Sequence, residues 1–167
     1  MHNESIFNKL DSMSDVILTL VNGVKNEWVK MDSQNYGYVK KKTLLGITIG
    51  RVCYGCMATN ALCELMGEPF KHDEISDRKK RAKKLNFGIT LYQLEVFEHS
   101  LDYLRRGYLK KFSLQLAQIS EVFKFDLEES QEVLRNYPKH LPEMNDINLL
   151  QLKEYEKLAA YLKKRNL

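Results

Sequence analysis

The sequence predicts an all-α protein, a single compact bundle of about seven helices with a long N-terminal helix and no significant sheet. Apolar residues recur at steps of three and four through most of the chain, which is the period of an amphipathic helix. Glycine and proline, the usual breakers of helices, number only 8 and 3. The 167 residues, 44% hydrophobic and 29% charged, suit one globular domain spanning residues 1–167.

The first predicted helix runs from Ile6 to Met31. Its apolar side chains share one stripe at Leu10, Met13, Ile17, Leu20, Val24, Trp28 and Met31. Gly23 weakens this helix by about 1 kcal/mol relative to alanine. Residues 1–32 are separate enough from the rest to project or to form a homodimer, and a turn is predicted over Asp32–Gly37.

Residues Thr43–Val52 are ambiguous, since Leu45, Ile47 and Ile49 alternate as they would in a strand. No partner strand is evident, so a helix or an irregular buried segment is favoured here. Cys56–Met66 then predicts a short buried helix that ends at Gly67.

The second half of the chain contains five further predicted helices, most of them marked by capping signals. The first begins at Asp73 or Ser76 and ends near Leu85, and the second follows the Thr90 and Gln93 capping box and ends at Gly107. The third spans Tyr108–Phe123. Asp126 and Glu129 repeat the capping spacing before Leu127–Tyr137, and Asp146 caps a last helix over Ile147–Arg165.

The formal net charge of +4 is concentrated in one segment. Residues 71–84 contain seven Lys or Arg and three Asp or Glu, so the remainder of the chain is formally neutral. A local basic patch of this kind attracts acidic proteins or phosphate backbones. A solvated helix face is the simpler interpretation of such a run.

Two surfaces are the predicted binding sites. One is the basic helix, with Arg78, Lys79, Lys80, Arg81, Lys83 and Lys84, and the other is the 36–42 loop, with Tyr36, Tyr38 and Lys40. The favoured hypothesis is a non-catalytic regulatory or adaptor protein that binds another protein through them. The alternative is nucleic-acid binding through the 78–84 helix, which would weaken steeply with salt.

The three cysteines are Cys53, Cys56 and Cys63, an odd and clustered set. With no signal peptide and no apolar run long enough to span a membrane, they predict reduced thiols, a cytoplasmic location and no membrane partner. With His72 they would complete four zinc ligands. Buried structural cysteines are favoured over metal or redox chemistry, and no metal or cofactor is expected.

A cysteine nucleophile is the third hypothesis. Cys56 follows Gly55 at the start of a predicted helix, where the dipole lowers the pKa of a thiol. The stretch from Gly55 to Leu62 resembles, over about a dozen residues, the nucleophile helix of papain-like cysteine peptidases. That resemblance implies a histidine base, for which His99 and His140 are the candidates, and a later sheet, which the sequence does not suggest.

The carboxylates on the helix after Thr90 give no clear active site. Glu95 and His99 are four residues apart, which is the spacing of an exposed pair on a helix. Glu98 is adjacent to His99, and no second copy of the motif exists to build a di-iron site.

Overall fold

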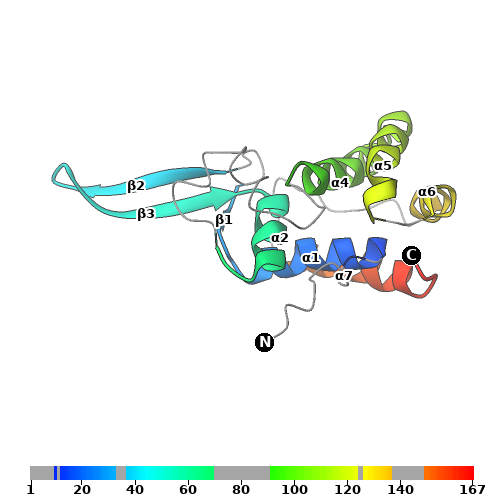
Figure 1. Cartoon of the computed structure of the whole chain (residues 1–167), viewed down its shortest axis with the longest axis horizontal. Coiled ribbons are helices and arrows are strands. Elements are labelled where there is room, and N and C mark those ends of the chain that lie inside the picture. Colours follow the sequence, from blue (N-terminus) through cyan, green and yellow to red (C-terminus); the bar gives the residue numbers. More distant parts are fainter. Residues whose placement is uncertain (1–9, 11, 33–36, 70–90, 124–125, 137–148) are drawn as a thin grey trace.

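The computed structural model of the chain describes residues 10, 12–32, 37–69, 91–123, 126–136 and 149–167 (Figure 1). Within them the protein has six helices and a three-stranded mixed sheet, so the prediction of an all-α bundle of about seven helices without a sheet is wrong. The strands are β1 (Lys30–Met31), β2 (Tyr38–Leu44) and β3 (Ile47–Gly55), in the order β1-β3-β2. The helices are α1 (Met13–Lys25), α2 (Met57–Met66), α4 (Leu91–Arg105), α5 (Leu109–Phe123), α6 (Leu127–Asn136) and α7 (Leu149–Lys163).

Helix α1 belongs to the core and does not project from it. Ser12 caps the helix by accepting a hydrogen bond from the Asp15 backbone N–H at 3.2 Å. Met13 and Ile17 are fully buried, and the helix packs against both α2 and α7. It is shorter than the sequence predicts because Lys30 and Met31 pair in parallel with the end of β3.

The crossing of α1 and α2 depends on Gly23. A Cβ atom at this position would lie 2.5 Å from the carbonyl carbon of Asn60, closer than any real contact. The side chain of Asn60 also accepts the Val29 backbone N–H at 3.0 Å. The same segment of α2 therefore sets both the helix crossing and the path of the chain into β1.

The chain between α1 and β1 is held by a carboxylate on α2. Trp28 Nε1 and Asn26 Nδ2 each donate a hydrogen bond of 2.7 Å to Glu64 Oε2. The indole is half-buried, and it packs against the hydrophobic core.

Strands β2 and β3 form an antiparallel hairpin that extends well beyond the helices (Figure 1). Leu44 pairs with Ile47, which leaves Leu45 and Gly46 as a two-residue turn with φ of 52° and 80°. Two positive φ values are typical of a type I′ hairpin turn. The prediction of a helix or buried irregular segment over Thr43–Val52 is therefore wrong, because its partner strand is the lysine-rich segment Tyr38–Leu44.

The four described later helices lie within the ranges predicted for them, whereas the predicted caps Thr90 and Asp146 and the helix predicted to end near Leu85 fall outside the described residues. Helix α5 begins one residue after the predicted Tyr108, and α6 begins at the predicted Leu127. Asp126 Oδ1 accepts the Glu129 backbone N–H at 2.8 Å, which confirms the predicted cap. No helix among the described residues is long and apolar enough to cross a membrane.

Candidate functional site: a projecting hairpin arm

The feature that stands apart from the packed body is the hairpin of residues 38–55, here called the arm (Figure 1). At its base Val39 and Cys53 pack against the hydrophobic core. The rings of Tyr38 and Tyr54 stack across the two strands with centroids 4.9 Å apart and planes 5° apart. The arm is thus anchored at one end, and the other end is presented to solvent.

The far end of the arm is an apolar tip made of Leu44, Leu45, Ile47 and Ile49. Leu45 is 95% exposed, and the other three are 61–69% exposed. Leu45 also has a φ of 52°, in the left-handed region that asparagine and glycine adopt more readily than leucine. Neither packing nor backbone preference in this structure accounts for a leucine at this position.

Directly behind the tip lies a collar of four cations, Lys40, Lys41, Lys42 and Arg51. Lys41 is the cross-strand partner of Arg51, and like charges placed opposite one another destabilise a sheet. Because side chains alternate along a strand, Lys40 and Lys42 lie on the other face of the arm. Residues 37–55 contain no Asp or Glu, and no carboxylate in the described ranges forms an ion pair with the collar.

Two of the predicted binding residues, Tyr38 and Lys40, belong to this arm, as parts of a strand instead of the predicted loop. Tyr36, the basic helix with Arg78–Lys84, and His72 and His140 fall outside the described residues. The predictions that rest on them remain predictions.

Cys56 lies at the N-cap of α2, in the helix-terminal position that the sequence predicts. Its side chain is buried, with Sγ 3.6 Å from Thr59 Oγ1. Burial, reinforced by the nearby Glu98 charge, raises the pKa of the Cys56 thiol. This environment opposes formation of a thiolate, whereas a nucleophile needs one. His99, the predicted base on α4, is exposed.

Glu98 provides a hydrogen-bond acceptor for a backbone N–H group at the N-terminus of α2. Its Oε2 accepts the Ala58 backbone N–H at 3.0 Å, so a carboxylate from α4 caps α2. Glu98 is buried, and desolvation raises its pKa to about 7 although the hydrogen bond from Ala58 acts in the opposite direction. Glu95 and Glu98 are therefore interior groups, which the exposed-pair interpretation of this helix missed.

The cysteines do not converge on a metal site in the described part of the chain, where no group of three or more His, Cys, Asp or Glu could hold an ion. Cys56 and Cys63 are buried in the core, and Cys53 is half-buried at the base of the arm. None of the three is joined in a disulfide.

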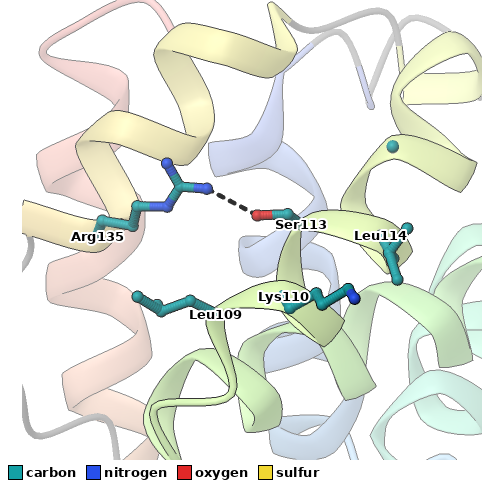
Figure 2. Close-up of a pocket in the computed structure, with 6 residues that line it drawn as sticks. Leu109, Lys110, Ser113, Leu114 and Arg135 are labelled. Carbon is teal, nitrogen blue, oxygen red and sulfur yellow. Dashed lines mark hydrogen bonds between the residues drawn. The ribbon is translucent and has the colours of Figure 1, made fainter.

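A second surface feature is an open groove between α5 and α6. It is lined by Leu109, Lys110, Ser113, Leu114, Ala117 and Arg135. Figure 2 shows Arg135 reaching from α6 to Ser113 on α5, where Nη2 donates to Oγ at 2.7 Å. Arg135 also bonds Gln131, so its guanidinium already has partners within the protein. The cations of the arm form no ion pair with any described residue, so the arm is the stronger candidate.

No known protein family, curated protein or solved structure matches this chain. The geometry of the arm is therefore the basis on which a function can be inferred.

The tip is the part of this site that the sequence interpretation missed. The signal that could have found it is the run Thr43-Leu44-Leu45-Gly46-Ile47-Thr48-Ile49, in which a glycine separates two short β-favouring segments. Three lysines precede this run, and lysine is depleted in strands, so the first half of the hairpin gave no strand signal.

Proposed function

We propose that this chain acts by binding, and that the arm is the part that attaches it to its partner. The tip is buried in the partner, and the collar lies against anionic groups of the same surface. The observation that carries the proposal is Leu45, an almost fully exposed leucine in a left-handed turn position. Exposed apolar patches bordered by polar residues mark interaction sites.

The collar supports the same conclusion. Lys41 and Arg51 repel one another across the arm, which lowers the stability of the folded hairpin. An anionic partner would convert this repulsion into attraction. The packed and desolvated environment of Cys56, in contrast, suits a structural role better than a catalytic one.

The test is photo-crosslinking in host cells with an aliphatic diazirine amino acid at position 45. The matched control carries the same probe at Tyr92, which is 65% exposed on α4. We expect a discrete adduct from position 45 that disappears when Lys40 and Lys42 are both replaced by glutamine. Equal adduct formation from the two positions, or an adduct that persists when Lys40 and Lys42 are replaced by glutamine, would contradict the proposal.

A further inference from the structure

We propose that the partner of the arm is the surface of a lipid bilayer that contains anionic lipids. The tip enters the boundary between headgroups and acyl chains, and the collar binds the lipid phosphates. This inference rests on the proposed function, since it assigns a chemistry to the surface that the arm contacts. It concerns shallow insertion of a hairpin, whereas the sequence prediction of no membrane partner considered only a spanning segment.

The order of side chains along the arm matches the order of layers in a membrane surface. Leu45 and the Leu44–Ile47 pair come first, the Thr43–Thr48 pair follows, and Ile49 lies at the register shift just before the collar. At about 3.3 Å per strand residue, Lys42 lies roughly 10 Å behind Leu45. Interfacial apolar groups penetrate roughly 5–10 Å, which places the collar at the headgroups.

The backbone of the arm limits insertion to this depth. β2 is an edge strand, and β1 pairs with β3 only at Tyr54 and Gly55, so no described strand covers the rest of either long edge of the arm. Unpaired backbone N–H and C=O groups are not tolerated in the hydrocarbon core. The turn and the first residue pair can therefore enter, and the rest of the arm stays among the headgroups.

The tip chemistry favours acyl chains over a nucleic acid. All four tip side chains are aliphatic, so none of them can hydrogen-bond a base edge or stack on a base as an aromatic ring does. Leucine and isoleucine can also act as wedges that open a base step, and a measurement of binding to duplex DNA distinguishes that outcome.

The collar supplies the preference for anionic lipid. Each cation near an anionic leaflet raises the partition coefficient about fivefold. The long stems of lysine and arginine allow the charge to reach the phosphate layer while the methylenes stay in apolar surroundings. With no acidic residue in 37–55, nothing on the arm opposes this attraction.

The experiment measures co-sedimentation of the full chain with vesicles of phosphatidylcholine alone or of equal parts phosphatidylcholine and phosphatidylserine. We expect binding to the anionic vesicles only, weakened by salt. Leu45→Asn should reduce the partition coefficient at least tenfold, because an exposed leucine no longer leaves water. Lys41→Glu changes the collar by two charges and should reduce it more than tenfold.

Both variants are chosen so that loss of binding cannot come from unfolding. Asparagine before Gly46 is the preferred type I′ pair, and Lys41→Glu places a carboxylate opposite Arg51, so each should stabilise the hairpin. The control is Lys164→Glu, an exposed cation after α7, which should leave binding within about twofold despite the same change of charge.

The inference would be overturned by equal binding to both kinds of vesicle, by undiminished binding of Leu45→Asn, or by a tip-dependent dimer seen by light scattering without vesicle binding. Tighter, tip-dependent binding to duplex DNA would overturn it in favour of a nucleic acid. In each case the proposed function is judged separately, because the crosslink from position 45 identifies a protein or nucleic-acid partner equally well.

Discussion

Two features of Leu45 lower the stability of the folded hairpin: its apolar side chain is exposed, and its backbone is left-handed. The left-handed backbone costs about 1–2 kcal/mol for an ordinary L-residue. We predict that Leu45→Asn slows amide hydrogen exchange across residues 38–55 about fivefold, measured by mass spectrometry. Faster exchange in the variant would show that the leucine stabilises the turn after all.

Glu98 makes stability depend on pH with a defined sign. Its folded pKa, about 7, is above the ordinary 4.5, so the folded state holds the proton more tightly. The stability that the folded state gains from holding the Glu98 proton is fully present below about pH 4.5 and is lost as pH rises through about 7. The full difference is on the order of 3 kcal/mol.

Glu98→Gln keeps an oxygen acceptor for the Ala58 N–H and removes the titration. Urea unfolding at about pH 5 and about pH 8 should show a fall in stability in the natural chain that largely disappears in the variant. Glu132→Gln, at an exposed site on α6, should keep the fall unchanged. The same fall in Glu98→Gln would remove Glu98 as its source.

The thiols should react in the order of their burial. Cys53 is half-buried, whereas Cys56 and Cys63 are buried, and burial raises the pKa of Cys56. A thiol-specific electrophile should therefore modify Cys53 first in the folded protein and the other two only at the rate of unfolding. Labelling of Cys56 ahead of Cys53 would restore the nucleophile hypothesis.

At the scale of elements, the contact of α1 with α2 leaves no space for a side chain at Gly23. Alanine in a helix is normally about 1 kcal/mol better than glycine. At Gly23 the sign should reverse, because the added carbon meets the Asn60 backbone at 2.5 Å. We expect Gly23→Ala to lower the free energy of unfolding by about 2–3 kcal/mol in urea titrations.

The matched control for this crossing is Gly50→Ala. A Cβ atom at Gly50 meets no atom within 4 Å, so its stability should remain close to that of the natural chain. A stabilising effect of Gly23→Ala would mean that the two helices separate easily, contrary to the packing described above.

The elements also show what sequence can and cannot reveal. The range of α6 followed from its apolar positions and the Asp126 cap, which are local signals. The hairpin did not follow, because its turn is Leu-Gly instead of Asn-Gly and its first strand contains three consecutive lysines. Glu98 was missed because only its tertiary neighbours bury it.

For the candidate site, Tyr38 and Lys40 were predicted as contact residues, but the tip was not. An exposed apolar cluster and a buried one have the same local sequence pattern, and the sequence was interpreted in favour of burial. Burial depends on the whole molecule. The periodicity of residues 43–52 does not show whether the rest of the protein will cover their apolar side chains.

At the scale of the whole molecule, the arm should be dispensable for folding. None of the core side chains comes from residues 40–52. Replacing 40–52 by Asn-Gly joins the Val39–Cys53 pair through a two-residue turn. We expect the thermal midpoint, followed by far-ultraviolet circular dichroism, to move by only a few degrees. A chain without a cooperative transition would show that the arm is part of the core.

The hydrogen bond between Trp28 and Glu64 fixes the tryptophan in the body of the molecule, so tryptophan fluorescence reports on the body and not on the arm. Trp28 is the only tryptophan, and it lies in the body, whereas the arm has tyrosines alone. The fluorescence emission of Trp28 therefore reports on the environment of the α1–β1 junction and does not respond to changes at the far end of the arm. With Trp28→Phe as background, Leu45→Trp would move the sole indole to the tip, where a blue shift reports transfer out of water and collisional quenchers measure its depth.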